Sequence, residues 1–261
     1  MNKRTALFAC LGISLALAAC DSGPSSSRST PAEREAAAAE RKAAYLEDLV
    51  ARRSLAAQAF DALTSALPDR VGLTEIVFDA KGIQAKGNAP SNTVLADYLS
   101  RLAAGSPLTD VMLRGSSLRT VRGRERVEFL LQTAVRNPGS GSAPAGAPSA
   151  VRLKELEKAL PPRQDPSEML RELQRLVLDS GLQMTKFVPG VEVAGEFAGE
   201  LAATIEVAGD PDEAGLFLRG LAGLSRLWVV DKFSLKAVAA DDPRSEVRAS
   251  VSARTYFLPR A

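Results

Sequence analysis

Two short stretches, AKGNAP at residues 85–90 and VAGDP at residues 207–211, decide the fold of this 261-residue chain. Each one ends a run of alternating apolar and polar residues, which is the pattern of a half-buried β-strand. Each one also precedes apolar residues at helical spacing, over residues 94–102 in the first case and 216–224 in the second. The same passage from strand to helix therefore occurs twice, which indicates a repeated supersecondary unit.

Working outward from these stretches, both halves of the chain read helix–strand–strand–helix–strand–strand. In the first half, strands are predicted over residues 72–79, 82–88, 110–117 and 125–135. In the second half, helices are predicted over residues 151–160 and 167–180 and from Pro211, and strands over residues 182–188, 201–209, 228–238 and 246–258. The expected fold class is α+β, with two ferredoxin-like αββαββ domains.

A long, coiled-coil-like helix is expected before the first domain. Residues 32–67 contain no proline or glycine, and residues recur there at alternating steps of three and four: Leu46, Leu49, Arg53, Ala56, Phe60, Leu63 and Leu67. Except for the arginine, this is the 3.5-residue seam of a coiled coil. The seam makes four residues candidates for contact with another chain: Leu46, Leu49, Phe60 and Leu63. It can equally pack on its own domain, and the pattern does not choose between the two.

Trp228 is the only tryptophan of the chain and a further candidate interaction residue. A tryptophan can anchor an interface with a partner. It can also pack internally at the start of the strand predicted over residues 228–238.

The first 20 residues resemble a bacterial lipoprotein signal peptide. A short basic region precedes an apolar run over residues 6–19, which is shorter than the ~20 residues of a comfortable membrane span and has the size of a signal-peptide core. The run ends in LAAC at residues 17–20, the pattern of a lipobox, so we expect Cys20 to be lipidated and to become the mature N-terminus. Asp21 resembles a signal for retention in the inner membrane.

Composition divides the rest of the chain. Residues 21–31 are rich in serine, proline and glycine and predict a flexible tether, and residues 137–149 have the composition of a linker. The expected organisation is a signal peptide 1–20, a tether 21–31, a long helix with the first domain 32–136, a linker 137–149 and a second domain 150–261.

The residue inventory argues against enzyme chemistry. The chain has no histidine, and its two cysteines, Cys10 and Cys20, both lie in the expected signal peptide. The usual general base, thiol nucleophile and zinc ligands are therefore missing. The sequence also lacks a phosphate-binding loop and a Gly-x-Ser-x-Gly motif. We expect no enzymatic activity, no cofactor and no metal.

Charge gives two further hypotheses about the surface. The net charge of +2 does not indicate nucleic-acid binding. Acidic residues spaced at four could line one helix face, but are interpreted as lying on an exposed connection: Glu192, Glu196 and Glu200. Arginines in a turn before the last strand of the first half are either solvated or meet lipid phosphates or an acidic partner: Arg119, Arg122, Arg124 and Arg126.

Both halves resemble periplasmic parts of type IV pilus proteins. The first half resembles the PilN family through LPDRVGLTEI at residues 67–76 and GNAPSN at residues 87–92. The second half resembles the PilO family through FVPG at residues 187–190, FLRGLAGLSR at residues 217–226 and VVDKFSLK at residues 229–236. These families are related to GspL and GspM of type II secretion.

The resemblance implies a non-enzymatic scaffold or assembly component of a type IV pilus or type II secretion-like machine. It implies a place at the periplasmic face of the inner membrane, with related periplasmic domains as partners in a homodimer or heterodimer. PilN-like proteins normally carry a cytoplasmic docking motif and a spanning helix, and here a lipid anchor is expected in their place. Carrying both domain types on one chain is also unusual.

Two alternatives remain open at this point. BON-type lipoproteins also contain αββαββ units and bind phospholipid or peptidoglycan, and the turn AKG at residues 80–82 fits them as well. The second half fits PilO better than it fits this type. A pilotin or chaperone for an outer-membrane ring is the other alternative, and Asp21 argues against it.

Overall fold

The computed structural model describes residues 30–104, 107–121, 123–136, 149–158, 160–161, 165–239 and 246–258. The predicted lipidation site Cys20 and sorting residue Asp21 lie outside the described residues, as does most of the predicted linker.

Six helices and eight strands make up the described chain. The first half contains α1 (Pro31–Arg53), α2 (Leu55–Ser65), β1 (Gly72–Asp79), β2 (Gly82–Ala89), α3 (Asn92–Ala104), β3 (Leu108–Val121) and β4 (Arg124–Val135). The second half contains α4 (Ser149–Lys158), α5 (Pro166–Asp179), β5 (Gln183–Val193), β6 (Gly199–Gly209), α6 (Pro211–Gly223), β7 (Trp228–Ala237) and β8 (Val247–Phe257). None of the described helices combines the length and hydrophobicity needed to cross a membrane.

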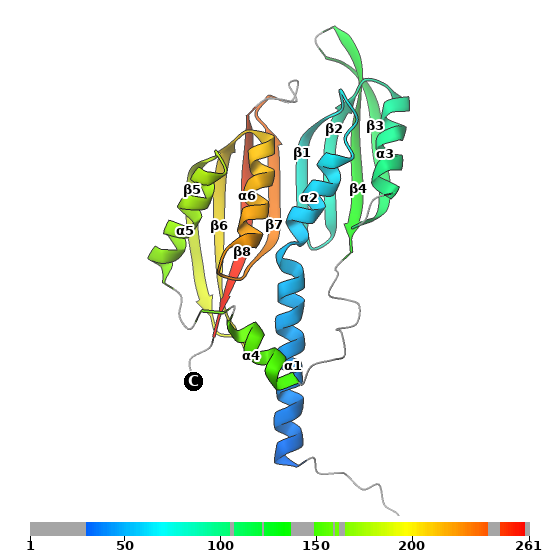
Figure 1. Ribbon diagram of the computed structural model, residues 1–261. Helices are drawn as coiled ribbons and strands as arrows, with labels where there is room; N and C mark the ends of the chain where they lie inside the picture. The colour runs from blue at the N-terminus through cyan, green and yellow to red at the C-terminus, as the bar shows by residue number, and fades with distance from the viewer. Residues whose placement is uncertain are drawn as a thin grey trace, which may run out of the picture.

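All eight strands form one antiparallel sheet, in the order β3-β4-β2-β1-β7-β8-β6-β5 (Figure 1). Within each half the order is the same, with the second and fourth strands in the middle. The halves meet where β1 pairs with β7 over four residue pairs, from Glu75 opposite Lys236 to Phe78 opposite Phe233. The α+β class is confirmed, and the two halves share a single sheet.

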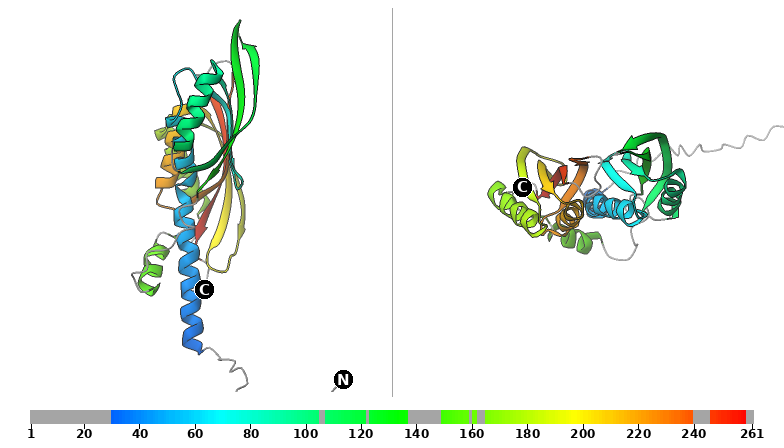
Figure 2. Two further views of the ribbon diagram at one scale, coloured as in Figure 1. Left: turned by 90° about the vertical axis from the view of Figure 1, so that its right-hand side faces the viewer. Right: turned by 90° about the horizontal axis from the view of Figure 1, so that it is seen from above.

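Helices α2, α3, α5 and α6 lie on one face of this sheet (Figure 2). A single apolar core runs beneath them through both halves and contains the rings of Phe60, Phe129, Phe217 and Phe233. Strands such as β2 alternate strictly between buried and accessible residues, because the opposite face is open over most of the sheet.

Two glycines permit turns that other residues would strain. Gly82 has a φ of +117° in the turn between β1 and β2, where Asp79 accepts a hydrogen bond from the Lys81 N–H at 2.8 Å. Gly181 has a φ of +86° and ends α5, as its position after the helical stripe predicts.

β3 is longer than predicted, and the turn expected over residues 119–126 is correspondingly shorter. β3 continues to Val121 and pairs with β4 up to Val121 opposite Arg124. β2 follows β4 only as far as Val127, so the tip of the β3–β4 hairpin projects beyond the sheet as a two-stranded arm (Figure 1). Cross-strand hydrogen bonds therefore override the polar local composition.

The two halves are equivalent in detail along their first hairpins. β1 and β5 each shift register at a threonine, Thr74 and Thr185. The Thr74 Oγ1 donates to the Lys86 carbonyl at 3.3 Å, and the Thr185 Oγ1 donates to the Glu206 carbonyl at 3.1 Å. The repeat is thus visible at residue level, although the sequence alone gave only a supersecondary correspondence.

The residue after each threonine makes a cross-strand ion pair with opposite polarity in the two halves. On β1 the acid Glu75 binds Lys86 of β2 at 2.7 Å, whereas on β5 the base Lys186 binds Glu206 of β6 at 3.3 Å. Equivalent positions therefore carry reversed charges.

We predict that Gly87→Ala destabilises the sheet. A Cβ at Gly87 would lie 2.5 Å from the Gly72 carbonyl oxygen and 2.6 Å from Phe129 Cζ, so the free energy of unfolding in urea should fall by about 1–3 kcal/mol. Gly115→Ala is the matched control, because a Cβ there meets nothing within 4 Å, and it should change stability by less than about 0.5 kcal/mol. Equal stability of the two variants would contradict this packing.

Candidate functional site

The candidate functional site is the junction where α1 meets the second half of the sheet. A capping box sets the start of α1: Thr30 Oγ1 accepts the Glu33 N–H at 3.3 Å, and Glu33 accepts the Thr30 N–H at 2.7 Å. The 23 residues of α1 span about 35 Å. Its first turns stand clear of the sheet (Figure 1), and burial begins at Ala43.

Apolar side chains form the base of the junction. Leu46 and Leu49 of α1 pack in a separate cluster with Leu227, Val229 and Tyr256. β7 begins and β8 ends with three consecutive buried residues. Here the sheet is covered on both faces, by the main core on one side and by α1 on the other.

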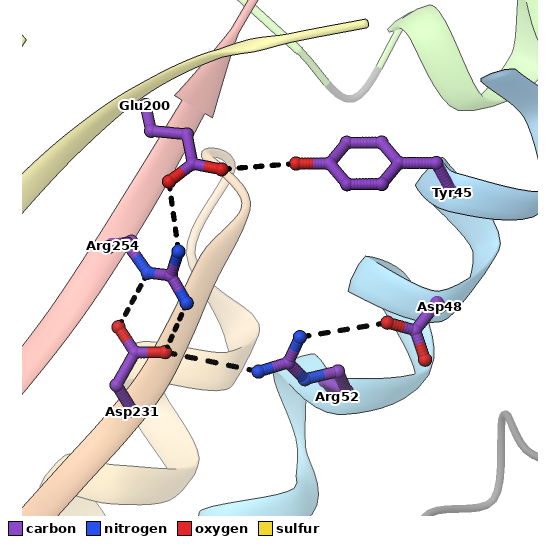
Figure 3. A network of polar contacts seen from close by, with 6 residues as sticks. All are labelled: Tyr45, Asp48, Arg52, Glu200, Asp231 and Arg254. Atoms are coloured by element: carbon purple, nitrogen blue, oxygen red, sulfur yellow. Dashed lines mark hydrogen bonds and ion pairs between the residues drawn. The ribbon is translucent and has the colours of Figure 1, made fainter. Parts of the chain in front are cut away.

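Arg254 of β8 is the centre of an ionic network beside this cluster (Figure 3). Its Nε and Nη2 donate to the two carboxylate oxygens of Asp231 on β7 at 2.7 and 2.6 Å. Its Nη1 donates to Glu200 of β6 at 2.9 Å. This two-pronged geometry is the strong form of the arginine–carboxylate pair, and it ties three neighbouring strands together.

The same carboxylates hold α1 in place. The Tyr45 hydroxyl donates to Glu200 at 3.1 Å. Arg52 lies 3.9 Å from Asp231 and 3.6 Å from Asp48 on its own helix. The network of Figure 3 therefore extends from the sheet onto two successive turns of α1.

The pKa shifts in the network favour the protonation states present at neutral pH. Hydrogen bonds to Asp231, followed by those to Glu200, raise the pKa of the Arg254 guanidinium. Burial, with Glu200 as the next cause, raises the pKa of the Tyr45 hydroxyl. Neither group exchanges protons near neutral pH, so the arrangement holds elements together and does not transfer protons.

Arg53, which interrupts the predicted seam, makes the second polar contact of the junction. Its guanidinium donates to the Leu224 carbonyl and lies 3.4 Å from the Arg226 carbonyl oxygen, just after α6. Burial lowers its pKa, but an arginine stays charged in proteins. A polar residue at a seam position thus fixes the loop that leads into β7.

The five candidate interaction residues all lie inside the chain, with 0–4% of their surface exposed: Leu46, Leu49, Phe60, Leu63 and Trp228. The predicted helix breaks at Ser54. Leu46 and Leu49, which precede this break, pack in the cluster with Leu227, Val229 and Tyr256, while the other three residues join the main core. In the described chain these residues pack internally, which is the second of the two alternatives that the sequence leaves open.

The acidic residues predicted on an exposed connection separate in the structure. Glu192 lies on β5, Glu196 in the loop, and Glu200 on β6 within the network. Sequence reasoning missed Tyr45, Asp231 and Arg254 altogether. The one available signal was the unbroken apolar runs beside them, which indicate strands buried on both faces.

The join between the halves is a second polar and aromatic contact. Glu75 binds Lys86 at 2.7 Å and Lys236 of β7 at 2.9 Å. Phe78 stacks on Phe233 with ring centres 5.5 Å apart. Hydrogen bonds from Lys86 and then Lys236 lower the pKa of Glu75, so this carboxylate crosslinks three strands at neutral pH.

Among the residues that the structure describes, no group of three or more cysteine, aspartate or glutamate side chains could hold a metal ion.

Two family models match separate halves of the chain. Residues 58–135 match the model described as fimbrial assembly protein (PilN). Residues 165–259 match the model described as the type IVa pilus alignment subcomplex PilO C-terminal domain. The first half is thus similar to the PilN family and the second half to the PilO family. The β1–β7 join thus connects a PilN-type half to a PilO-type half.

Two individual proteins are similar to part of the chain. The chain is 32% identical over 113 residues to the type IV pilus inner membrane component PilO of Pseudomonas aeruginosa, across 41% of this chain and 54% of that protein. It therefore spans about half the length of this curated relative. The crystal structure of the type 4 fimbrial biogenesis protein PilO from the same species matches with 29% identity and a TM-score of 0.36, over 42% of this chain and 87% of that chain.

Helix α1 lies outside both matched ranges. Its docking on the PilO-type half is therefore a feature of this chain that the family matches do not report.

We predict that Arg254→Met loosens α1. The change leaves Glu200 and Asp231 half-buried without their main partner, so the free energy of unfolding should fall by about 1–3 kcal/mol and proteases should cut α1 faster. Arg101→Met is the control, because its ion pair with Asp97 is about half exposed and should contribute less than about 0.5 kcal/mol. Unchanged protease sensitivity in Arg254→Met would exclude a clamping role.

We predict an acid-sensitive join at Glu75. Its pKa is lower in the folded than in the unfolded chain, so its contribution is complete above the unfolded value of ~4.3 and is lost as the pH falls through the folded value. Glu75→Gln should cost roughly 1 kcal/mol at pH 7. The difference from the unmodified chain should shrink when urea unfolding is repeated at pH 3, and a constant difference would argue against the shift.

Proposed function

We propose that this chain is a non-enzymatic scaffold of a type IV pilus assembly machine, acting at the periplasmic face of the inner membrane. The observation that carries the proposal is the β1–β7 join, which places a PilN-type and a PilO-type half in one sheet. The similar PilO of Pseudomonas aeruginosa is a type IV pilus inner membrane component, which supports the same location.

In this proposal each half is a ferredoxin-like αββαββ domain that pairs with related domains. The intrachain join is an example of such pairing. Partners are periplasmic domains of other pilus components, and the open sheet edges and the projecting β3–β4 arm are the surfaces available to them. The arm lies at the end of the molecule opposite the start of α1 (Figure 1), so its arginines face a partner and not the membrane that holds α1.

The proposed anchor is the lipid on Cys20. A tether over residues 21–29 then leads to α1, whose docking on the PilO-type half sets the height and direction of the sheet above the membrane. A rigid junction suits an alignment role, because it transmits the position of the anchor to the domains.

The anchor is tested with Cys20→Ser in the full chain. We expect loss of labelled palmitate and release of the protein from membranes into the periplasmic fraction. Cys10→Ser is the control and should keep both the label and the membrane location. Asp21→Ser should move the lipidated protein toward outer-membrane fractions. Retention of Cys20→Ser in membranes would contradict lipid anchoring.

The scaffold function is tested by affinity purification of the full chain from detergent-solubilised envelopes. We expect pilus assembly proteins to copurify. The control joins residues 1–31 to an unrelated soluble domain and should recover none of them. Recovery of no pilus component, together with binding to phospholipid vesicles or peptidoglycan, would favour the BON-like alternative.

A further inference from the structure

The eight-stranded sheet has two unpaired edges, on β3 and on β5. The described chain exposes ten large apolar residues, and six of them lie on these two strands: Met112, Leu113, Leu118, Val188, Val191 and Val193. Edge strands of monomeric proteins usually avoid such side chains. Their concentration on both edges indicates that another protein surface covers these edges in the functional assembly.

The two free edges are of the same kinds as the two edges joined inside the chain. β1 and β5 are the first strands of their halves, and β7 and β3 are the third strands. The internal join pairs a first strand with a third strand, so a first strand and a third strand remain free at the ends. Because every neighbouring pair is antiparallel, β5 and β3 run in opposite directions and can pair as β1 and β7 do.

Directly opposed residues identify the counterparts in the two halves. The opposed residues are Lys86, Leu130 and Gly115 in the first half, and Glu206, Ser250 and Ser234 in the second. Gly115 is therefore the counterpart of Ser234, and Ser117 is the counterpart of Lys236. Lys186 on β5 takes the place of Glu75 on β1. If β5 pairs with β3 in the register in which β1 pairs with β7, Lys186 lies opposite Ser117 and Val188 lies opposite Gly115.

The charges at this transferred contact are complementary. Inside the chain, Glu75 faces Lys236, which lies opposite Arg248 on β8. At the free edges Lys186 takes the place of Glu75 and would face the neutral Ser117, which lies opposite Glu128 on β4 in the place of Arg248. Lys186 and Glu128 both have accessible side chains, which pair within one copy with Glu206 at 3.3 Å and with Arg119 at 2.9 Å.

The irregularities of these edge strands do not block pairing. β1 carries the same threonine shift as β5 and still joins β7. In the transferred register Lys186, Phe187 and Val188 lie opposite Ser117, Ser116 and Gly115, where both strands are regular. The contact therefore has three regular pairs, because Pro189 has no backbone N–H and would face the shift of β3 between Leu113 and Gly115.

We propose that β5 of one copy pairs with β3 of a second copy of this chain, antiparallel, with Val188 opposite Gly115 and Lys186 beside Glu128. The contact joins unlike surfaces, so each pair of copies keeps a free edge at both ends and can add further copies or close into a ring. The inference rests on the proposed scaffold function and specifies how its copies associate.

The register is tested by disulfide trapping of the full chain in membranes. Copies with Val188→Cys and copies with Gly115→Cys are coexpressed and oxidised, and we expect a mixed dimer. Leu178→Cys is the control in place of Val188→Cys, because Leu178 is 75% exposed but lies on helix α5 and not on an edge strand. Chains without an added cysteine give the background from Cys10 and Cys20. A yield no higher than that of the control overturns the proposal.

A charge exchange tests the partner residues. Lys186→Glu with Glu206→Lys keeps the ion pair within the chain but presents an acid to Glu128, and it should weaken trapping roughly fivefold. Glu128→Lys in the other copy should restore it, and an unchanged yield in the first mixture would overturn the proposed register. If trapping fails while pilus proteins still copurify, this contact is wrong and the scaffold function stands.

Discussion

Four residue pairs between β1 and β7 hold the molecule together as one body. Without them, each half would be a four-stranded sheet with helices on one face and two open edges. With them, the apolar core continues from Phe129 in the first half to Phe217 in the second. The stacked rings of Phe78 and Phe233 and the three-strand contact of Glu75 lie at this line. The relation between the PilN-type and PilO-type halves depends on this short ladder together with the core that α2 and α6 share beneath it.

The second constraint is the attachment of α1 to the far side of the same sheet. The apolar contacts of Leu46 and Leu49 stabilise this attachment more than the ion pairs do, because ion pairs that are partly exposed stabilise weakly. The network around Arg254 fixes the orientation of α1 on the sheet, since a guanidinium bound to two carboxylates tolerates little rotation. A helix that approaches from the proposed membrane anchor thereby reaches the PilO-type half at one angle. This rigidity is what a protein with an alignment role requires, and it needs no catalytic group.

The repeat within the chain explains why the sheet can join its own halves. Two units with the same strand order present unlike edges, a first strand and a third strand, and unlike edges can meet without symmetry. The reversal of charge between Glu75 and Lys186 distinguishes the inner edge from the outer one. A duplicated unit can in this way acquire one internal contact and keep a different one at its ends.

Periodicity and turn chemistry, both local, determined the order of helices and strands, the hairpin at Gly82 and the helix start at Pro211, and composition shows that histidine is absent. The family resemblance followed from the same local patterns. Only the tertiary structure decided that the seam breaks at Ser54, that its leucines are internal, and that the arginine-rich stretch is a projecting arm. It also brought Tyr45, Glu200 and Arg254 together, which are distant along the chain. A local pattern records which side of an element is apolar, but not which surface covers it, because that surface comes from residues elsewhere in the chain.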